Sequence, residues 1–327
     1  MARAPESEAV ADRDISVVIQ GPLLLGKVEG IARCVDSVRS VLPAAEIIVS
    51  TWQGEDASAL GPGVQVIQSA DPGCFLLASG LPINLNRQQR STLAGLQRAT
   101  RKYSLKLRTD LALTDRRFLV VAPTRAGSLF ERPMTMSNLY LRDPEKFTLL
   151  FHFADIAQFG LTRDLLEFWD GDLFAEDELL FPADAPGGPR ARLRLFPEQA
   201  ATLRWLARKG VQVQLEDPAQ IDRPLLELWA QVLAQNVHLV DWRKSGIRYP
   251  ERFASDPSSF ATLLSEEKAD SLAAHGFSYR KARLNAFILS RLLHGPLASL
   301  VAGLRARSPL LNRVLRRLWA SYHQMSR

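Results

Sequence analysis

Two cations and one carboxylate stand at the end of a predicted buried strand. The strand is predicted from Tyr103 to Leu107 and includes Lys106, and Arg108 and Asp110 follow it. In an open α/β sheet, ligands bind in the crevice beyond the carboxyl ends of the strands. One carboxylate among cations suits a metal–diphosphate complex, because the carboxylate is a hard oxygen ligand for Mg²⁺ or Mn²⁺ and the cations face the phosphates. The alternative is an ion pair between Arg108 and Asp110 at the protein surface.

A basic helix start lies upstream of this strand. A helix is predicted from about Leu85 to Thr100, and its first turns contain Asn86, Arg87 and Arg90. Backbone N–H groups at a helix N-terminus and guanidinium groups both bind phosphate oxygens. We therefore expect this helix start, and Arg87 in particular, to bind a phosphate group. A solvent-facing helix start with a basic face is the alternative.

Two carboxylates farther along the chain are candidates for general-base catalysis. Asp155 follows the apolar run from Phe147 to Phe153, which is predicted to be a strand, and Glu198 lies at the start of a predicted helix. Either side chain could accept a proton from an acceptor hydroxyl during group transfer. Asp155 could also bind a metal or the acceptor. For both residues the alternative is a structural role, because a carboxylate at a helix N-terminus caps the helix and interacts favourably with its dipole.

Strands alternate with helices along the first third of the chain. Apolar, β-branched runs predict strands at 15–19, 46–51, 64–67 and 103–107, and apolar residues at helical spacing follow the first strand and precede the last. This alternation predicts a mostly parallel, Rossmann-like α/β sheet. The chain has no Gly-x-Gly-x-x-Gly after the first strand, no phosphate loop ending in Gly-Lys-Ser/Thr and no Gly-x-Ser-x-Gly. These absences argue against a dinucleotide dehydrogenase, a P-loop enzyme and an α/β serine hydrolase.

The composition is that of a soluble protein with a full apolar core. The 327 residues are 46% hydrophobic, and no apolar run is long enough for a membrane-spanning helix. Residues 1–14 are polar and acidic, so we expect a disordered N-terminus and no secretory signal. The two cysteines, Cys34 and Cys74, lack the spacing of a metal site. From the cysteine content and the lack of a secretory signal, we expect a cytoplasmic protein.

Positive charge is concentrated at the C-terminal end of the sequence. Residues 271–327 contain ten Lys and Arg and no Asp or Glu, whereas residues 1–270 contain 31 basic and 35 acidic side chains. Leucine and valine recur there at helical spacing beside the arginines, which predicts basic amphipathic helices. Such helices bind anionic membrane surfaces. A helical cap packed on the body and an RNA-binding tail are the alternatives, and the scarcity of aromatic residues for base stacking disfavours nucleic acid.

Several of these segments together resemble the WavE family of lipopolysaccharide-synthesis proteins. The matching segments, in chain order, are ISVVIQGP (15–22), EIIVSTW (46–52), DPG (71–73), NRQ (86–88), KLRTD (106–110), FHFAD (151–155), FGL (159–161) and PEQ (197–199). The likeness keeps the order of the motifs over residues 15–249, which makes it specific.

The resemblance implies a glycosyltransferase with a GT-A-like nucleotide-sugar-binding domain over residues 15–255, followed by a basic helical region over residues 256–327. The sugar would pass from a nucleotide-sugar donor to a lipopolysaccharide-core, capsule or other lipid-linked glycan acceptor at the inner face of the cytoplasmic membrane. Asp155 and Glu198 are then the catalytic candidates. The expected donor-binding residues are Gln20, Gly21, Asn86, Arg87, Lys106, Arg108 and Asp110.

One departure from the GT-A pattern bears on the cofactor. The usual metal signature has two acidic residues around one intervening position, and here Arg108 takes the place of the first. Asp110 alone could hold Mg²⁺ or Mn²⁺, with diphosphate and water as further ligands, since Mg²⁺ needs few protein ligands. Alternatively, Arg108 and Lys106 neutralise the departing diphosphate directly.

The same departure supports a second hypothesis, a catalytically inactive nucleotide-sugar-binding scaffold of a glycan-synthesis complex. A nucleotidyltransferase is a third hypothesis, and it would need a glycine-rich triphosphate loop after the first strand. Gln20-Gly21-Pro22 does not provide that loop.

Overall fold

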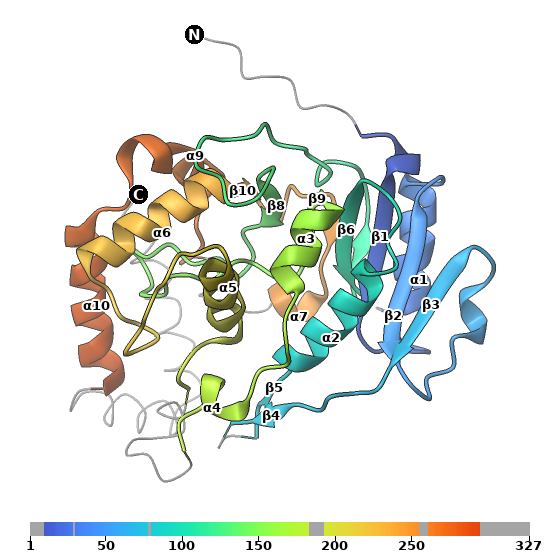
Figure 1. Cartoon of the computed structure of the whole chain (residues 1–327), viewed down its shortest axis with the longest axis horizontal. Coiled ribbons are helices and arrows are strands. Elements are labelled where there is room, and N and C mark those ends of the chain that lie inside the picture. Colours follow the sequence, from blue (N-terminus) through green and yellow to red (C-terminus); the bar gives the residue numbers. More distant parts are fainter. Residues whose placement is uncertain (1–9, 29, 78–79, 183–192, 255–260, 295–327) are drawn as a thin grey trace.

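A seven-stranded sheet forms the centre of the protein. The computed structural model describes residues 10–28, 30–77, 80–182, 193–254 and 261–294 (Figure 1). The strand order is β10-β8-β9-β6-β1-β2-β3, and only β9 runs antiparallel to its neighbours. The strands are β1 (Ile15–Gln20), β2 (Glu46–Trp52), β3 (Val64–Ser69), β6 (Tyr103–Arg108), β8 (Met134–Ser137), β9 (Gln158–Leu161) and β10 (Val237–Val240). The expected α/β fold with a mostly parallel sheet is confirmed.

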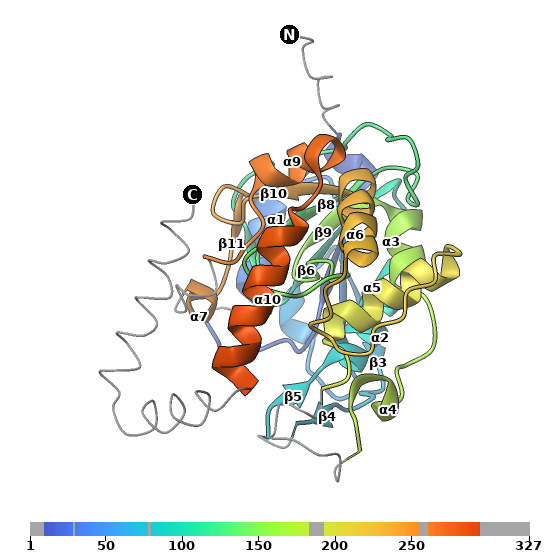
Figure 2. The same cartoon turned by 90° about the vertical axis from the view of Figure 1, so that its left-hand side faces the viewer.

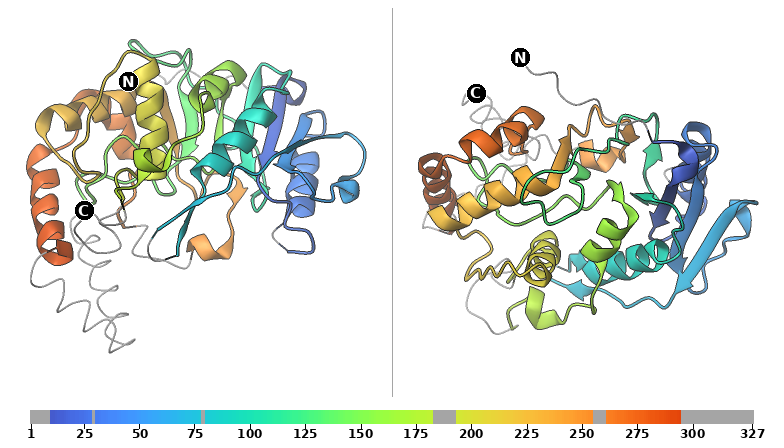
Figure 3. Two further views of the ribbon diagram at one scale, coloured as in Figure 1. Left: turned by 60° about the horizontal axis from the view of Figure 1, so that its bottom comes forward. Right: turned by 45° about the horizontal axis from the view of Figure 1, so that its top comes forward.

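Helices cover both faces of this sheet (Figure 3). On one face, the buried apolar residues of α1 (Ile31–Val41) belong to the same apolar cluster as Val17 and Leu105. On the other face, α2 (Leu85–Leu96) approaches β1 closely at Gly95. A Cβ on Gly95 would lie 2.4 Å from Cγ1 of Val18, so only glycine permits this approach.

Further helices extend the second face and enclose an aromatic core. Phe130, Phe153, Phe168 and Trp205 pack together there, with ring centroids 4.3 Å apart for Phe130 and Trp205. The helices of this layer are α3 (Thr162–Trp169), α5 (Pro197–Arg208) and α6 (Arg223–Asn236). The shorter elements are η1 (Asp12–Asp14), η2 (Ser58–Leu60), β4 (Phe75–Leu76), β5 (Pro82–Ile83), β7 (Ala112–Leu113), α4 (Glu176–Leu179), β11 (Ile247–Arg248) and α7 (Glu251–Ala254).

A segment predicted as a strand is irregular in the structure. Residues 147–153 form no strand. Side chains of α5 hydrogen-bond their backbone instead: Phe153 N donates to Thr202 Oγ1 at 2.9 Å, and Gln199 Nε2 donates to Leu150 O at 2.9 Å. The prediction was wrong because the helical layer, and not a neighbouring strand, buries this apolar run. The strand of this region is β9, which begins after Asp155.

The first part of the basic C-terminal region packs on the body. α9 (Glu266–His275) and α10 (Tyr279–His294) lie beside α6, at the opposite end of the molecule from β3 (Figures 1 and 2). Leu272 and Phe277 are buried in the same apolar cluster as residues of α6. The structural role that was the alternative to membrane binding therefore holds for these two helices.

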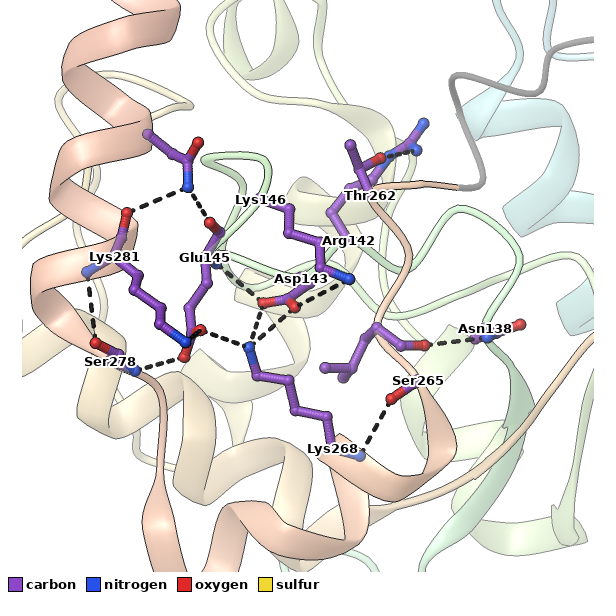
Figure 4. Close-up of polar contacts among 12 residues, drawn as sticks. Asn138, Arg142, Asp143, Glu145, Lys146, Thr262, Ser265, Lys268, Ser278 and Lys281 are labelled. Carbon is purple, nitrogen blue, oxygen red and sulfur yellow. Dashed lines mark hydrogen bonds and ion pairs between the residues drawn. The ribbon is translucent and has the colours of Figure 1, made fainter. Parts of the chain in front are cut away.

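A buried polar network fastens α9 and α10 to the loop after β8 (Figure 4). Lys268 Nζ lies 2.9 Å from carboxylate oxygens of both Asp143 and Glu145, and the Asp143 side chain is only 1% exposed. Glu145 also accepts a hydrogen bond from Ser278 N at 2.6 Å and one from Asn285 Nδ2. Breaking such a buried pair on one side is costly, so this network should hold the two helices in place.

The structure places the ends of the body outside the boundaries expected from sequence. Val10 is buried and η1 precedes residue 15, so ordered structure begins within the segment that was expected to be disordered; residues 1–9 lie outside the described residues. The expected boundary between residues 255 and 256 precedes two helices that pack on the body. Residues 295–327, which contain most of the predicted amphipathic stripes, also lie outside the described residues.

Candidate active site

The carboxyl ends of β1 and β6 lie side by side at one edge of the sheet. Their register pairs Gln20 with Arg108, the last residue of each strand. Thr109 N donates to Gln20 O at 3.2 Å, and Gln20 Oε1 accepts from Ser91 Oγ of α2 at 2.7 Å. Gly21 has a φ of 118°, a conformation that favours glycine. The fold therefore brings the turn after β1 next to the Arg108–Asp110 segment.

Asp110 is held between two arginines. Its carboxylate accepts from Arg108 at 3.0 Å (Nε) and 2.8 Å (Nη2), and it also accepts from Arg252 of α7. The Asp110 side chain is 3% exposed, whereas those of Arg108 and Arg252 are 34% and 54% exposed. A buried carboxylate thus orients two guanidinium groups that remain accessible at the sheet edge. We call these three residues the arginine cluster.

Phe253 contacts both guanidinium groups of the arginine cluster. Its ring centroid lies 5.5 Å from Arg108 Cζ and 4.9 Å from Arg252 Cζ, and Tyr140 packs edge-on against it at 5.7 Å. Cation–π contacts of this kind add to the ion pairs in fixing the guanidinium orientation. Sequence reasoning missed Arg252, because it lies 142 residues from Asp110 on a four-residue helix that carries no motif.

The donor set at Asp110 fits a divalent cation poorly. Both carboxylate oxygens accept from guanidinium groups, so a cation would have to displace an arginine. Within the parts of the chain that the structure describes, no three His, Cys, Asp or Glu side chains cluster at metal-binding distance. Guanidinium groups bind phosphate oxygens directly and in two-pronged fashion. The geometry therefore does not suit a resident metal at Asp110, and it presents two guanidinium groups that suit an anionic ligand.

Lys106 lies beneath the sheet edge and not at its rim. Its side chain is fully buried, Nζ donates to the backbone oxygen of Asp155, and Nζ lies 4.9 Å from the ring centroid of Trp169. Burial lowers the pKa of Lys106 to about 7. Gln88 Nε2 of α2 donates to the same Asp155 oxygen at 3.2 Å. Lys106 therefore holds the loop before β9 in place. Its buried side chain is not positioned to contact a donor phosphate.

The two candidate catalytic carboxylates lie near each other. Asp155 comes from the loop before β9, and Glu198 from the first turn of α5. Burial raises the pKa of Glu198 to about 7, and the negative charge of Asp155 adds to this effect. A carboxylate whose pKa lies near neutral pH can both accept and release a proton, which is what general-base catalysis requires.

His152, three residues before Asp155 in the sequence, is a buried neutral side chain. Its Nε2 accepts from Arg142 N at 2.8 Å. Burial, with a contribution from the charge of Arg142, lowers the pKa of His152 to about 3. A histidine that stays neutral over the physiological range and is engaged by the backbone is a structural residue here.

At the start of α2, Arg87 and Asn86 point to different partners. Arg87 binds the Asp71 carboxylate with Nε at 2.8 Å and Nη2 at 2.7 Å, and its side chain is 34% exposed. Asn86 is buried, and its amide both donates to Phe174 O at 2.9 Å and accepts from Phe174 N at 2.8 Å. Asn86 thus secures a loop, while Arg87 presents a guanidinium group near the end of β3. Arg90 is exposed.

Comparison with known families gives one match. The sequence model described as WavE lipopolysaccharide synthesis matches residues 15–290, which is most of the chain. The match includes the strands of the sheet, the arginine cluster, both candidate carboxylates and the start of α10. A search of curated proteins gave no match.

Proposed function

The chain belongs to the WavE lipopolysaccharide synthesis family and so takes part in lipopolysaccharide synthesis, and on this premise we propose that it is a glycosyltransferase. In this proposal a sugar passes from a nucleotide donor to a hydroxyl of a lipopolysaccharide-core, capsule or other lipid-linked glycan, on a sheet of the GT-A type. The observation that carries the proposal is the arginine cluster at the carboxyl edge of a parallel sheet, where such folds bind ligands. Release of nucleoside diphosphate and transfer of sugar by the purified protein would test it.

The proposed mechanism follows from the charges that develop during transfer. The departing diphosphate gains negative charge, and the guanidinium groups of Arg108 and Arg252 would stabilise it, because preoriented donors act strongly at such a site. Asp110 holds both groups in place. The acceptor hydroxyl loses a proton, which Glu198 would accept, because burial and, secondarily, the charge of Asp155 raise the pKa of Glu198 to about 7.

An inactive scaffold that binds nucleotide sugars is the second candidate function. The specific observation in its favour is Arg108, which stands where GT-A enzymes usually have the first acid of the metal signature. Both candidates bind the donor, so turnover separates them. A purified protein that binds a nucleotide sugar and neither hydrolyses nor transfers it would favour the scaffold.

Arg87→Ala is expected to weaken nucleoside diphosphate binding at least about tenfold and to leave nucleoside binding nearly unchanged. Only the diphosphate carries negative charge that the guanidinium group can bind. A donor at a hundred times its Kd stabilises a protein by about 2.7 kcal/mol, so a thermal-shift titration can measure both ligands. Asp71→Asn is the matched control, because it removes the partner of Arg87 and keeps the guanidinium group. Equal weakening of both ligands by Arg87→Ala would mean a structural role for the Arg87–Asp71 pair.

The proposed place of action is the inner face of the cytoplasmic membrane, reached through the basic segment after α10. In the described part of the chain, no helix combines the length and apolar character of a bilayer span. Residues 295–327 contain six arginines and no acidic residue. Each basic residue near an anionic bilayer contributes about 1 kcal/mol to binding.

We therefore expect the full chain to co-sediment with anionic liposomes at low salt, and a chain ending at His294 to lose most of this binding. The shortened chain keeps Leu272, Phe277 and the contacts of Glu145, so it should fold and bind nucleotide normally. Neutral liposomes are the control for charge. Equal sedimentation of the two chains would place any membrane contact on the body instead.

A further inference from the structure

A groove of about 710 Å³ runs between α1 and the small sheet formed by β7 and β11. One wall is the side of α1 from Ala32 to Val41, and the other is formed by Ala112, Leu113, Thr114 and Arg248. Its volume lies within the range of small-molecule sites. The groove begins two residues beyond Asp110, yet it shares no lining residue with the arginine cluster. It is therefore a separate surface beside the proposed donor site.

Three of the four charged side chains that line the groove are cations. Lys27, Arg33 and Arg248 line it, and none of them has an ion-pair partner among the described residues. Other arginines at this end of the sheet are paired, such as Arg87 with Asp71. Unpaired cations that converge on a concave surface repel one another and attract anions, so their placement indicates a negatively charged ligand.

The acidic residue in the groove does not cancel these charges. Asp36 of α1 is a lining residue, and its carboxylate lies 3.9 Å from Arg39 Nη1. The groove is otherwise polar at Ser40 and Thr114, whose hydroxyl groups suit a sugar ligand. Its charge and its hydroxyl groups together describe a site for an anionic glycan.

The walls of the groove are fixed before any ligand binds. Ser37 Oγ accepts from Leu113 N at 2.9 Å and donates to Cys34 O at 2.7 Å, which joins β7 to α1. Below it, Cys34 is fully buried, and its thiol lies 3.7 Å from Arg108 O. A preformed site loses less conformational entropy on binding, and this one is built on the segment that also carries the arginine cluster.

We infer that this groove binds the anionic part of the glycan acceptor, a phosphate or sugar carboxylate remote from the reacting hydroxyl. The name acceptor rests on the proposed transferase function. The preference for an anion rests on Lys27, Arg33 and Arg248, and the preference for a sugar rests on the hydroxyl groups of the groove. The donor diphosphate has its own cations at Arg108 and Arg252. A groove continuous with the chain segment after Asp110 would hold an extended acceptor beside the donor.

The test measures binding of a phosphate-bearing oligosaccharide released from lipopolysaccharide, by calorimetry at low salt. The same oligosaccharide after chemical dephosphorylation and after carboxyl reduction separates the two anion sources. We expect the full-length protein to bind the untreated sugar at least about tenfold more tightly than at least one treated form. The double variant Arg33→Ala/Arg248→Ala should remove this difference, and Lys244→Ala, an exposed cation outside the groove, should keep it.

Nucleoside diphosphate binding is measured on the same variants. Retained nucleotide binding with lost oligosaccharide binding in the double variant supports the inference. The inference is overturned if neither chemical treatment weakens oligosaccharide binding, or if the double variant binds the oligosaccharide as the wild type does. Loss of nucleotide binding in the double variant also overturns it, because the groove would then belong to the donor site. If the wild-type protein binds the anionic oligosaccharide through the groove but transfers no sugar, the groove stands and the transferase proposal fails.

Discussion

Glu198→Gln is expected to reduce sugar transfer at least about a hundredfold while stabilising the protein above neutral pH. A general base typically contributes a factor of 10² to 10⁴ to the rate, and glutamine cannot accept the proton. In the wild-type enzyme, transfer should rise with pH up to about 7 and then level off, because the pKa of Glu198 is raised to about 7 and only the carboxylate acts as the base. Rates at saturating donor between pH 5 and pH 8.5 would measure this profile.

The stability change has a definite sign. Burial and the charge of Asp155 raise the pKa of Glu198 in the folded protein from 4.5 to about 7, so the folded state holds this proton more tightly than the unfolded state does. Below pH 4.5 the carboxyl is protonated in both states and costs nothing. Between pH 4.5 and about 7 the unfolded chain releases this proton while the folded protein keeps it, so the folded state loses stability, on the order of 1–3 kcal/mol once the pH has passed 7. Glu198→Gln removes that cost.

Denaturant unfolding at pH 5 and pH 8 would detect this difference. The gain of Glu198→Gln over wild type should appear at pH 8 and be much smaller at pH 5. Glu227→Gln is the control, since Glu227 is an exposed residue of α6 with only an i,i+4 pair to Arg223. A Glu198→Gln protein that transfers sugar at the wild-type rate would remove Glu198 from the mechanism, whatever its stability. Because Glu198 and Asp155 interact, the measured pKa belongs to the pair.

The central parallel strands β1, β2 and β6 could be predicted from sequence because each is a short, largely buried apolar run. The predicted strand 15–19 corresponds to β1, and every residue of β1 is buried. The same rule failed at residues 147–153, where an equally apolar run is buried by helices. The pattern of apolar residues predicts that a segment is buried, but it does not predict whether a strand or a helix covers that segment. The antiparallel strand β9 has four residues, too few to give a pattern.

The site was predictable only where it depends on strand ends. Carboxyl ends of neighbouring parallel strands meet at one edge, and this placed Gln20 beside Arg108. The direction of a side chain depends on tertiary packing instead. Lys106 was expected at the rim and is fully buried, because it lies within β6, two residues before the strand end, where Trp169 of α3 packs against it. Arg252 lies on α7, which follows β11, and the fold brings α7 next to Asp110. No local sequence pattern predicts this contact.

Asp110→Asn is expected to lower both transfer and stability. Sequence alone suggested a metal ligand or a surface ion pair at Asp110, but the carboxylate is 3% exposed and pairs with two arginines. Its neutralisation removes the negative charge that Arg108 and Arg252 share. Because both guanidinium groups are partly exposed, water moderates the cost, and we expect a loss of about 1–3 kcal/mol in the free energy of unfolding. Asp115→Asn, which breaks the similarly spaced but exposed Arg117 pair, should cost less.

The two explanations of Asp110 differ in what a chelator does. If Asp110 works by orienting the arginines, wild-type protein should bind nucleoside diphosphate and transfer sugar in EDTA, and Mg²⁺ or Mn²⁺ should not rescue Arg252→Ala. That variant should lose at least about a hundredfold in transfer rate, as expected for removal of a preoriented charge at the transition state. Arg252→Lys should restore little, since an ammonium group cannot share Asp110 and a phosphate in the same two-pronged geometry. If EDTA abolishes nucleoside diphosphate binding and Mn²⁺ restores it, then a cation displaces a guanidinium group from Asp110 when the donor binds, and the arginine cluster describes only the unliganded protein.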